Sequence, residues 1–172
     1  VMIGGTLPLL HSGYRVGHGD TIILESCEYC NSFLSFYPTV AVILNVEADH
    51  LDFFHDLAEI EQSFRKFAGL VPPSVHDIAN ADDAGAQAAL KDFPREVFTF
   101  GLTNPADCTA AAITEKDGCP VFDVVIRGKK YAHVTLHIYG RHNILNALAA
   151  AASAYVLGLP GEAVEEGLDA FH

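Results

Sequence analysis

Two runs of apolar, largely β-branched residues stand out in the first third of the chain. Residues 21–26 read TIILES and residues 39–46 read TVAVILNV, so the apolar residues in both are consecutive rather than alternating. Such runs are typical of strands buried on both faces, as in a parallel sheet. Residues 57–70 instead carry apolar side chains at helical spacing. We therefore expect a strand, a loop, a strand and an amphipathic helix in this order.

The next segment repeats this order of elements. Residues 76–83 predict a short strand with its loop, residues 84–93 a helix and residues 96–102 another strand. Strands that alternate with helices predict a doubly wound, mostly parallel α/β sheet. Ligands bind to such sheets at the loops that follow the carboxyl ends of the strands.

The pattern changes over residues 110–139. Apolar and polar residues alternate there, and Lys-Asp-Gly and Arg-Gly-Lys turns separate the segments, which predicts a small antiparallel β-meander attached to the parallel sheet. An alanine-rich helix is expected over 142–158 and a short one over 162–171. We see no linker or internal repeat and expect one domain over residues 1–172.

The charge and composition limit the possible partners. A formal net charge of −12 leaves no basic stripe for a nucleic acid, so we expect no such partner. A small anion could still bind through backbone amides, a helix N-terminus or a bridging metal. The sequence has no apolar run long enough to span a bilayer, so we expect no membrane partner and a cytoplasmic location.

Cys27 and Cys30 form the one C-x-x-C pair among the four cysteines. Such a pair can be half of a zinc site or a redox pair. Here a second C-x-x-C or H-x-x-H does not follow at zinc-finger spacing. We therefore expect reduced thiols that bind no metal.

The segment NVEADHLD, residues 45–52, concentrates carboxylates and an imidazole after an apolar strand. Glu47, Asp49, His50 and Asp52 at a strand end suggest a divalent cation. In the alternative interpretation, Asp49 caps the following helix and His50 merely packs or faces solvent. Glu25 follows the other apolar strand, with Glu28 three residues later. An acid buried near a strand end needs a partner, and a cation shared with His50 would supply one.

The segment GRHNILN, residues 140–146, opens the alanine-rich helix. His142 and Asn146 are one turn apart on one face, and Asn143 and Asn146 are also neighbours, so their polar groups can point the same way. Paired amides suit the edge of a purine. Asn is also favoured near helix N-termini for local hydrogen bonding alone.

These segments, in this order and spacing, resemble the central domain of the Mur ligases, the ATP-dependent ligases that build the peptidoglycan peptide. The resemblance rests on ESCEYCNSFL, NVEADHLD and GRHNILNALAAAASA and covers nearly everything from Gly4 to Phe171. The E-x-x-E-Y-x-x-S-F-L segment is most like that of the members that add L-alanine to UDP-N-acetylmuramate. The resemblance to the Mur ligases implies a fold like that of P-loop NTPases.

The resemblance also implies roles for individual residues. Glu25 and His50 match ligands of a magnesium ion that meets the ATP phosphates. His142 and Asn146 match residues that lie against the adenine, and Asn143 belongs to the same motif. The family phosphorylates a carboxylate with ATP, after which an amine attacks the acyl phosphate. Because magnesium prefers oxygen ligands, a histidine ligand implies tolerance of manganese.

The sequence also departs from the family pattern. Phe64 stands where other Mur ligases carry a carbon-dioxide-modified lysine, which favours the alanine-adding members. The residues contain no G-x-x-x-x-G-K-[ST] loop. We expect a fragment without that loop, the N-terminal UDP-binding domain and the C-terminal ligase domain, and therefore inactive alone. A murein tripeptide ligase and a non-catalytic nucleotide- or metal-binding module of the same fold remain alternatives.

Overall fold

The computed structural model describes residues 1–7 and 11–172. Contacts between residues divide the chain into two compact units, Val1–Phe36 and Tyr37–His172. None of the helices in the described residues is both long and apolar enough to cross a membrane.

The first unit is built on a small antiparallel pair of strands. Strand β1 (Met2–Leu7) pairs with β2 (Ser12–Tyr14), and the 3₁₀ helix η1 (Tyr29–Ser35) ends the unit. The strand predicted over 21–26 is reduced to a single parallel bridge between Leu24 and Met2. A strand needs a neighbour along its length, and without one Ile22 and Ile23 stay exposed.

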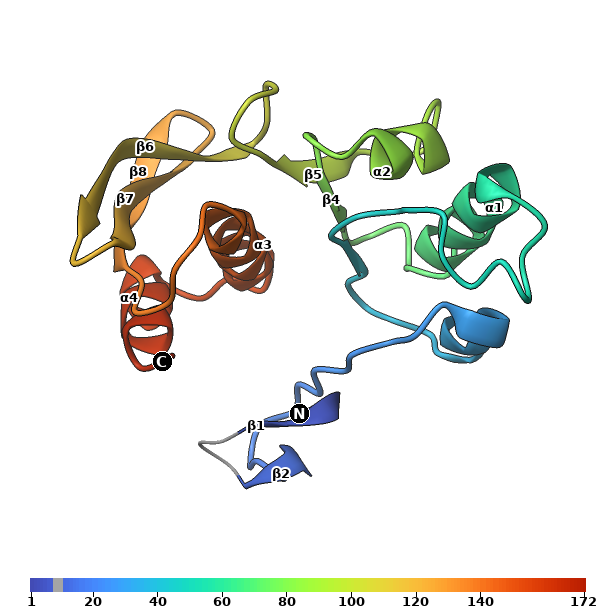
Figure 1. Cartoon of the computed structure of the whole chain (residues 1–172), viewed down its shortest axis with the longest axis horizontal. Coiled ribbons are helices and arrows are strands. Elements are labelled where there is room, and N and C mark those ends of the chain that lie inside the picture. The colour runs from blue at the N-terminus through green and yellow to red at the C-terminus, as the bar shows by residue number, and fades with distance from the viewer. Residues whose placement is uncertain (8–10) are drawn as a thin grey trace. The chain divides into compact units, whose positions relative to one another are not determined.

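The second unit contains one six-stranded sheet (Figure 1). Its spatial order follows the sequence: β3 (Val42–Ile43), β4 (Asp77–Asn80), β5 (Val97–Phe100), β6 (Cys108–Lys116), β7 (Cys119–Ile126) and β8 (Lys129–Thr135). The pairs from β3 to β6 are parallel and those from β6 to β8 antiparallel. This confirms the predicted mostly parallel sheet with an attached meander. The prediction of a long strand over 39–46 is wrong in extent, because only Val42 and Ile43 pair with β4.

Two glycine turns set the meander as the sequence predicted. Asp117 and Gly118 have φ values of 53° and 80°, and Arg127 and Gly128 have values of 49° and 79°. Two consecutive residues in the left-handed region match the twist of a tight hairpin, and glycine adopts that region without strain.

Four helices complete the second unit: α1 (Leu57–Ala68), α2 (Ala84–Ala89), α3 (His142–Val156) and α4 (Gly161–Asp169). Asp56 caps α1 by accepting a hydrogen bond from the Glu59 amide at 2.9 Å, and Asp83 caps α2 by accepting one from the Ala86 amide at 2.7 Å. Helix α2 ends four residues before the predicted boundary at Phe93, and the other three begin and end close to prediction.

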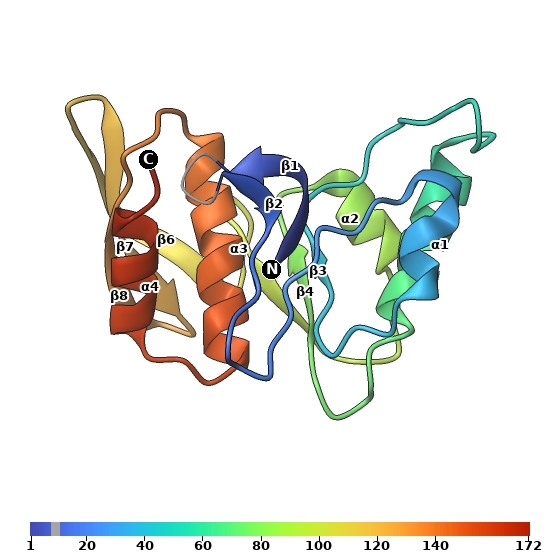
Figure 2. The ribbon, with the colours of Figure 1, turned by 90° about the horizontal axis from the view of Figure 1, so that it is seen from below.

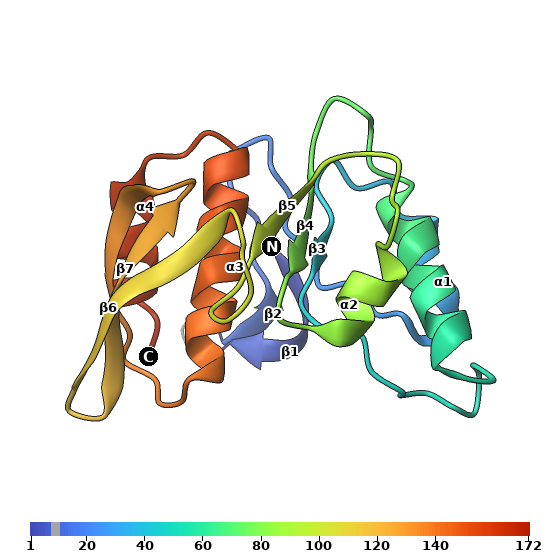
Figure 3. The same cartoon turned by 90° about the horizontal axis from the view of Figure 1, so that it is seen from above.

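The helices cover both faces of the sheet, as a doubly wound arrangement requires. Ile78 and Ala79 are consecutive residues of β4 and point to opposite faces. Ile78 packs in a core with α3, whereas Ala79 packs in a second core with Ile60 of α1 and Ala86 of α2. Figures 2 and 3 show α3 running alongside β5 and β6, with α4 beside β8. The carboxyl ends of β3, β4 and β5 therefore share one edge of the sheet.

Candidate nucleotide site

A cavity of about 410 Å³ lies in the second unit, beside the carboxyl ends of β4 and β5 and the start of α3. It is lined by Asp82, Leu102, Thr103, Arg141, His142 and Leu145. Two leucines offer apolar surface for a flat ring, and the other four side chains are polar. The cavity occupies the edge of the sheet at which open α/β folds bind ligands.

The start of α3 depends on a glycine with a left-handed conformation. Gly140 has a φ of 103°, and a methyl group there would lie 2.6 Å from Cε1 of His142. The backbone conformation therefore favours glycine, and a methyl group there would require the imidazole to move. Gly140 allows His142 to fold back at the helix start, where its side chain lines the cavity.

The two asparagines of the same motif form the amide pair that their spacing predicted. Nδ2 of Asn146 donates a hydrogen bond to Oδ1 of Asn143 at 3.1 Å, and Nδ2 of Asn143 donates to the carbonyl of Tyr139 at 2.8 Å. His142 is part of the cavity lining given above, and the two asparagines are not. Asn143 thus ties the helix start to the preceding residues, while its part in nucleotide binding stays a prediction.

Asp82 holds the loop that forms the opposite wall of the cavity. Its carboxylate accepts hydrogen bonds from the amides of Leu102 (2.6 Å), Thr103 (3.1 and 3.2 Å) and Asn104 (2.7 Å), and from the Thr103 hydroxyl (2.7 Å). Burial opposes ionisation of Asp82, but these donors outweigh it and hold the pKa below its usual range. Sequence reasoning missed this residue, although two acids directly after a predicted strand were a signal.

The segment that contains His50 leaves the carboxyl end of β3. Asp83 anchors its beginning by accepting a hydrogen bond from the Val46 amide at 3.0 Å. His50 has a φ of 53°, its amide donates to Oδ1 of Asp49 at 2.7 Å, and its Nε2 lies 4.0 Å from Oδ2 of Asp49. Asp49 does not cap α1, because Asp56 does. The alternative interpretation of Asp49 as a helix cap is therefore wrong.

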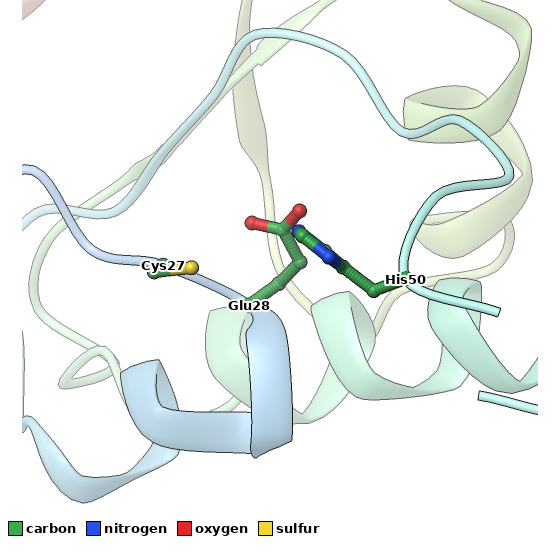
Figure 4. A group of neighbouring side chains, drawn as sticks. All are labelled: Cys27, Glu28 and His50. Carbon is green, nitrogen blue, oxygen red and sulfur yellow. The ribbon is translucent and has the colours of Figure 1, made fainter. Parts of the chain in front are cut away.

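Glu25, Cys27 and Glu28 belong to the first unit. Oε2 of Glu25 accepts a hydrogen bond from the Gly4 amide at 2.7 Å. Cys27 and Glu28 directly precede η1, and His50 lies in the segment before α1 (Figure 4). Because Glu25 and His50 belong to different units, their sharing of one ion stays a prediction. All four cysteines are free thiols, and Cys27 and Cys30 are exposed.

Phe64, at the position predicted for the modified lysine of other family members, lies on α1. Its side chain is partly buried against the core that contains Ile43 and Phe54. An aromatic ring in this place contributes packing and carries no charge.

Comparison with known proteins agrees with this arrangement. The family model "Mur ligase middle domain" matches residues 7–154. The UDP-N-acetylmuramate–L-alanine ligases of Caldanaerobacter subterraneus and Clostridium novyi are each 42% identical to the chain, over 99% and 100% of its length. The chain spans 37% of the length of each relative.

Solved structures show the same fold. The UDP-N-acetylmuramate-alanine ligase MurC from Thermotoga maritima superposes with a TM-score of 0.83 at 26% identity, over 99% of this chain and 38% of its own. The UDP-N-acetylmuramate:L-alanyl-γ-D-glutamyl-meso-diaminopimelate ligase from Neisseria meningitides gives a TM-score of 0.74 at 30% identity, over 87% and 47%. The family match, the relatives and the shared fold together establish that the chain belongs to the Mur ligase family.

Proposed function

We propose that this chain is the ATP-handling part of a ligase that joins L-alanine to UDP-N-acetylmuramate. The observation that carries the proposal is the cavity beside the carboxyl ends of β4 and β5, with His142 in its lining. Leu102 and Leu145 suit the faces of an adenine ring, and His142 and Thr103 can offer hydrogen bonds to its edge or to the ribose. The two curated relatives above carry the name of this activity.

Arg141 gives this cavity a cationic side chain in a chain of net charge −12. Asp82 also lines it, but the donors of the β5–β6 loop already surround its carboxylate. Among the residues that line the cavity, Arg141 is therefore the charged side chain that we expect to bind an anionic ligand such as a nucleotide phosphate.

Glu25 and His50 would hold a divalent cation, with Mg²⁺ and Mn²⁺ as the candidates. One carboxylate and one imidazole fit such an ion as a donor set, and the imidazole favours Mn²⁺ more than Mg²⁺. A bound cation would offset the charge of the ATP phosphates during phosphoryl transfer. The hydrogen bond from the His50 amide to the Asp49 carboxylate restrains the backbone that carries the imidazole.

The test is a turnover assay on the ligase polypeptide that carries this chain together with a phosphate-binding loop. We expect phosphate release from ATP that requires both L-alanine and UDP-N-acetylmuramate. The tripeptide L-alanyl-γ-D-glutamyl-meso-diaminopimelate is the matched alternative substrate, because a solved ligase of that name shares the fold. Turnover with the tripeptide and not with L-alanine would reassign the chain to that reaction. ATP binding without turnover on either substrate would make it a binding module.

A further inference from the structure

The loop between β5 and β6 supplies Leu102 and Thr103 to the cavity, and one carboxylate holds it in place. Among the described hydrogen bonds, Asp82 receives donors from three successive residues, Leu102, Thr103 and Asn104. Nδ2 of Asn104 also donates to the carbonyl of Ala81 at 2.8 Å, which ties the loop to the same segment a second time.

The loop and the carboxylate fit closely. A methyl group on Gly101 would lie 3.1 Å from Oδ1 of Asp82, which is tighter than ordinary van der Waals contact. The absence of a side chain at Gly101 therefore lets the carboxylate reach the amides that follow. A methyl group at this position would require the carboxylate to shift by a few tenths of an ångström.

Asp82 is itself fixed from the side of the sheet. Its amide donates to Oδ1 of the buried Asn80 at 2.9 Å, and Nδ2 of Asn80 donates to the carbonyl of Leu44 at 3.0 Å. Gln87 of α2 donates to the carbonyl of Asn80 at 3.0 Å. The Asp82 carboxylate therefore links the end of β4 to the Leu102–Thr103 loop and fixes the position of that loop beside the cavity.

We propose that Asp82 is a positioning residue for nucleotide binding, which places the Leu102–Thr103 wall opposite His142 and Leu145. This inference rests on the proposed function, because it assigns the cavity to the base and ribose of ATP. The role is indirect: Asp82 acts through the loop and not through its own charge on the ligand. The loss of its hydrogen bonds would let the wall move away from α3 and weaken the fit to a flat base.

The test compares Asp82→Asn with Asp107→Asn in the complete ligase. Asp107 is the matched control because it holds the other end of the same loop, by accepting bonds from the amide (3.0 Å) and hydroxyl (3.1 Å) of Thr99, and it is not in the cavity lining. We expect Asp82→Asn to raise KM for ATP about tenfold while kcat at saturating ATP and KM for L-alanine change less than twofold. Asp107→Asn should leave KM for ATP within twofold.

A second variant and thermal unfolding separate positioning from loss of folding. Gly101→Ala keeps the Asp82 charge but places a methyl group against the carboxylate, so KM for ATP should also rise, by less than in Asp82→Asn. Similar losses of Tm in the two Asp→Asn variants, with a change in KM for Asp82→Asn alone, support positioning. An unchanged KM for ATP in both Asp82→Asn and Gly101→Ala, or equal increases in the two Asp→Asn variants, refutes this role but not the proposed function. A wild-type ligase without ATP-dependent turnover refutes both.

Discussion

Asp77 should make the chain less stable as the pH rises from about 4 to about 7. Its side chain is fully buried, and Oδ2 accepts a hydrogen bond from Nη2 of Arg95 at 3.0 Å. Oδ1 is buried without a hydrogen-bond partner in the described structure. Burial raises the pKa of Asp77 from 3.8 to about 6, and the positive charge of Arg95 and a backbone hydrogen bond limit the rise.

The sign follows from which state binds the proton more tightly. Between the unfolded pKa of 3.8 and the folded pKa of about 6, the native state holds more protons than the unfolded state, so stability falls as pH increases. At 1.36 kcal/mol per pKa unit, this shift amounts to about 3 kcal/mol. A carboxamide does not titrate. The unfolding free energy of Asp77→Asn should therefore improve relative to wild type by up to about 3 kcal/mol between about pH 4 and pH 7.

The assay is urea unfolding of both proteins at a series of pH values, with the difference between them as the measured quantity. The difference cancels the other titrating groups, and it also contains a constant cost from placing an amide beside Arg95. Asp107→Asn is the control of opposite sign, because hydrogen bonds from Thr99 and Arg127 outweigh burial and lower the pKa of Asp107. The stabilisation that the ionised Asp107 gives the wild-type protein is present at neutral pH and disappears as the pH falls, and Asp107→Asn removes it. A pH-independent difference for Asp77→Asn, or one of the opposite slope, would refute the reasoning.

Three further changes test other contacts. Gly85→Ala would place a methyl group 2.0 Å from the Val46 carbonyl and should lower the free energy of unfolding in urea by about 1–3 kcal/mol or more. The control Gly167→Ala on α4 places its methyl group in open space and should not destabilise, so equal effects of the two changes would contradict the packing argument. Asp56→Ala removes the cap of α1 and should cost about 1 kcal/mol, with no loss expected for Asp56→Ser; a neutral Ala variant would show that the cap is dispensable. His50→Ala should weaken Mn²⁺ binding to the complete ligase at least tenfold more than the control His55→Ala on the same segment, as measured by electron paramagnetic resonance. Equal Mn²⁺ affinities of the two variants would show that His50 is not a metal ligand.

The sequence predicted the second unit more accurately than the first, for reasons that the packing explains. The meander follows from alternation and from two turns, Asp117–Gly118 and Arg127–Gly128, whose chemistry is local. Helix α1 follows from its apolar spacing, whereas its Asp56 cap was not predicted. The apolar runs at 21–26 and 39–46 predicted longer ladders than form, because hydrophobicity predicts burial and cannot supply the neighbouring strand.

The candidate site shows a similar division. His142 was found from its motif, because the spacing along a helix start can be read from the sequence. Asp82 was missed because its donors lie about twenty residues later in the chain. Two acids after the predicted strand mark the position, but the sequence does not show which loop they hold, because only the parallel pairing of β4 with β5 brings its members together.

The acidic composition does not by itself exclude an anionic nucleotide from this edge of the sheet, because three of the acids there accept hydrogen bonds from nearby groups. Asp82 is surrounded by the amides of the β5–β6 loop, Asp83 accepts from Val46 and Ala86, and Asp49 accepts from the His50 amide. Hydrogen bonds of this kind stabilise the ionised carboxylates. Arg141 faces the cavity as its cationic member. The local arrangement of donors, and not the net charge of −12, therefore determines what this edge can bind.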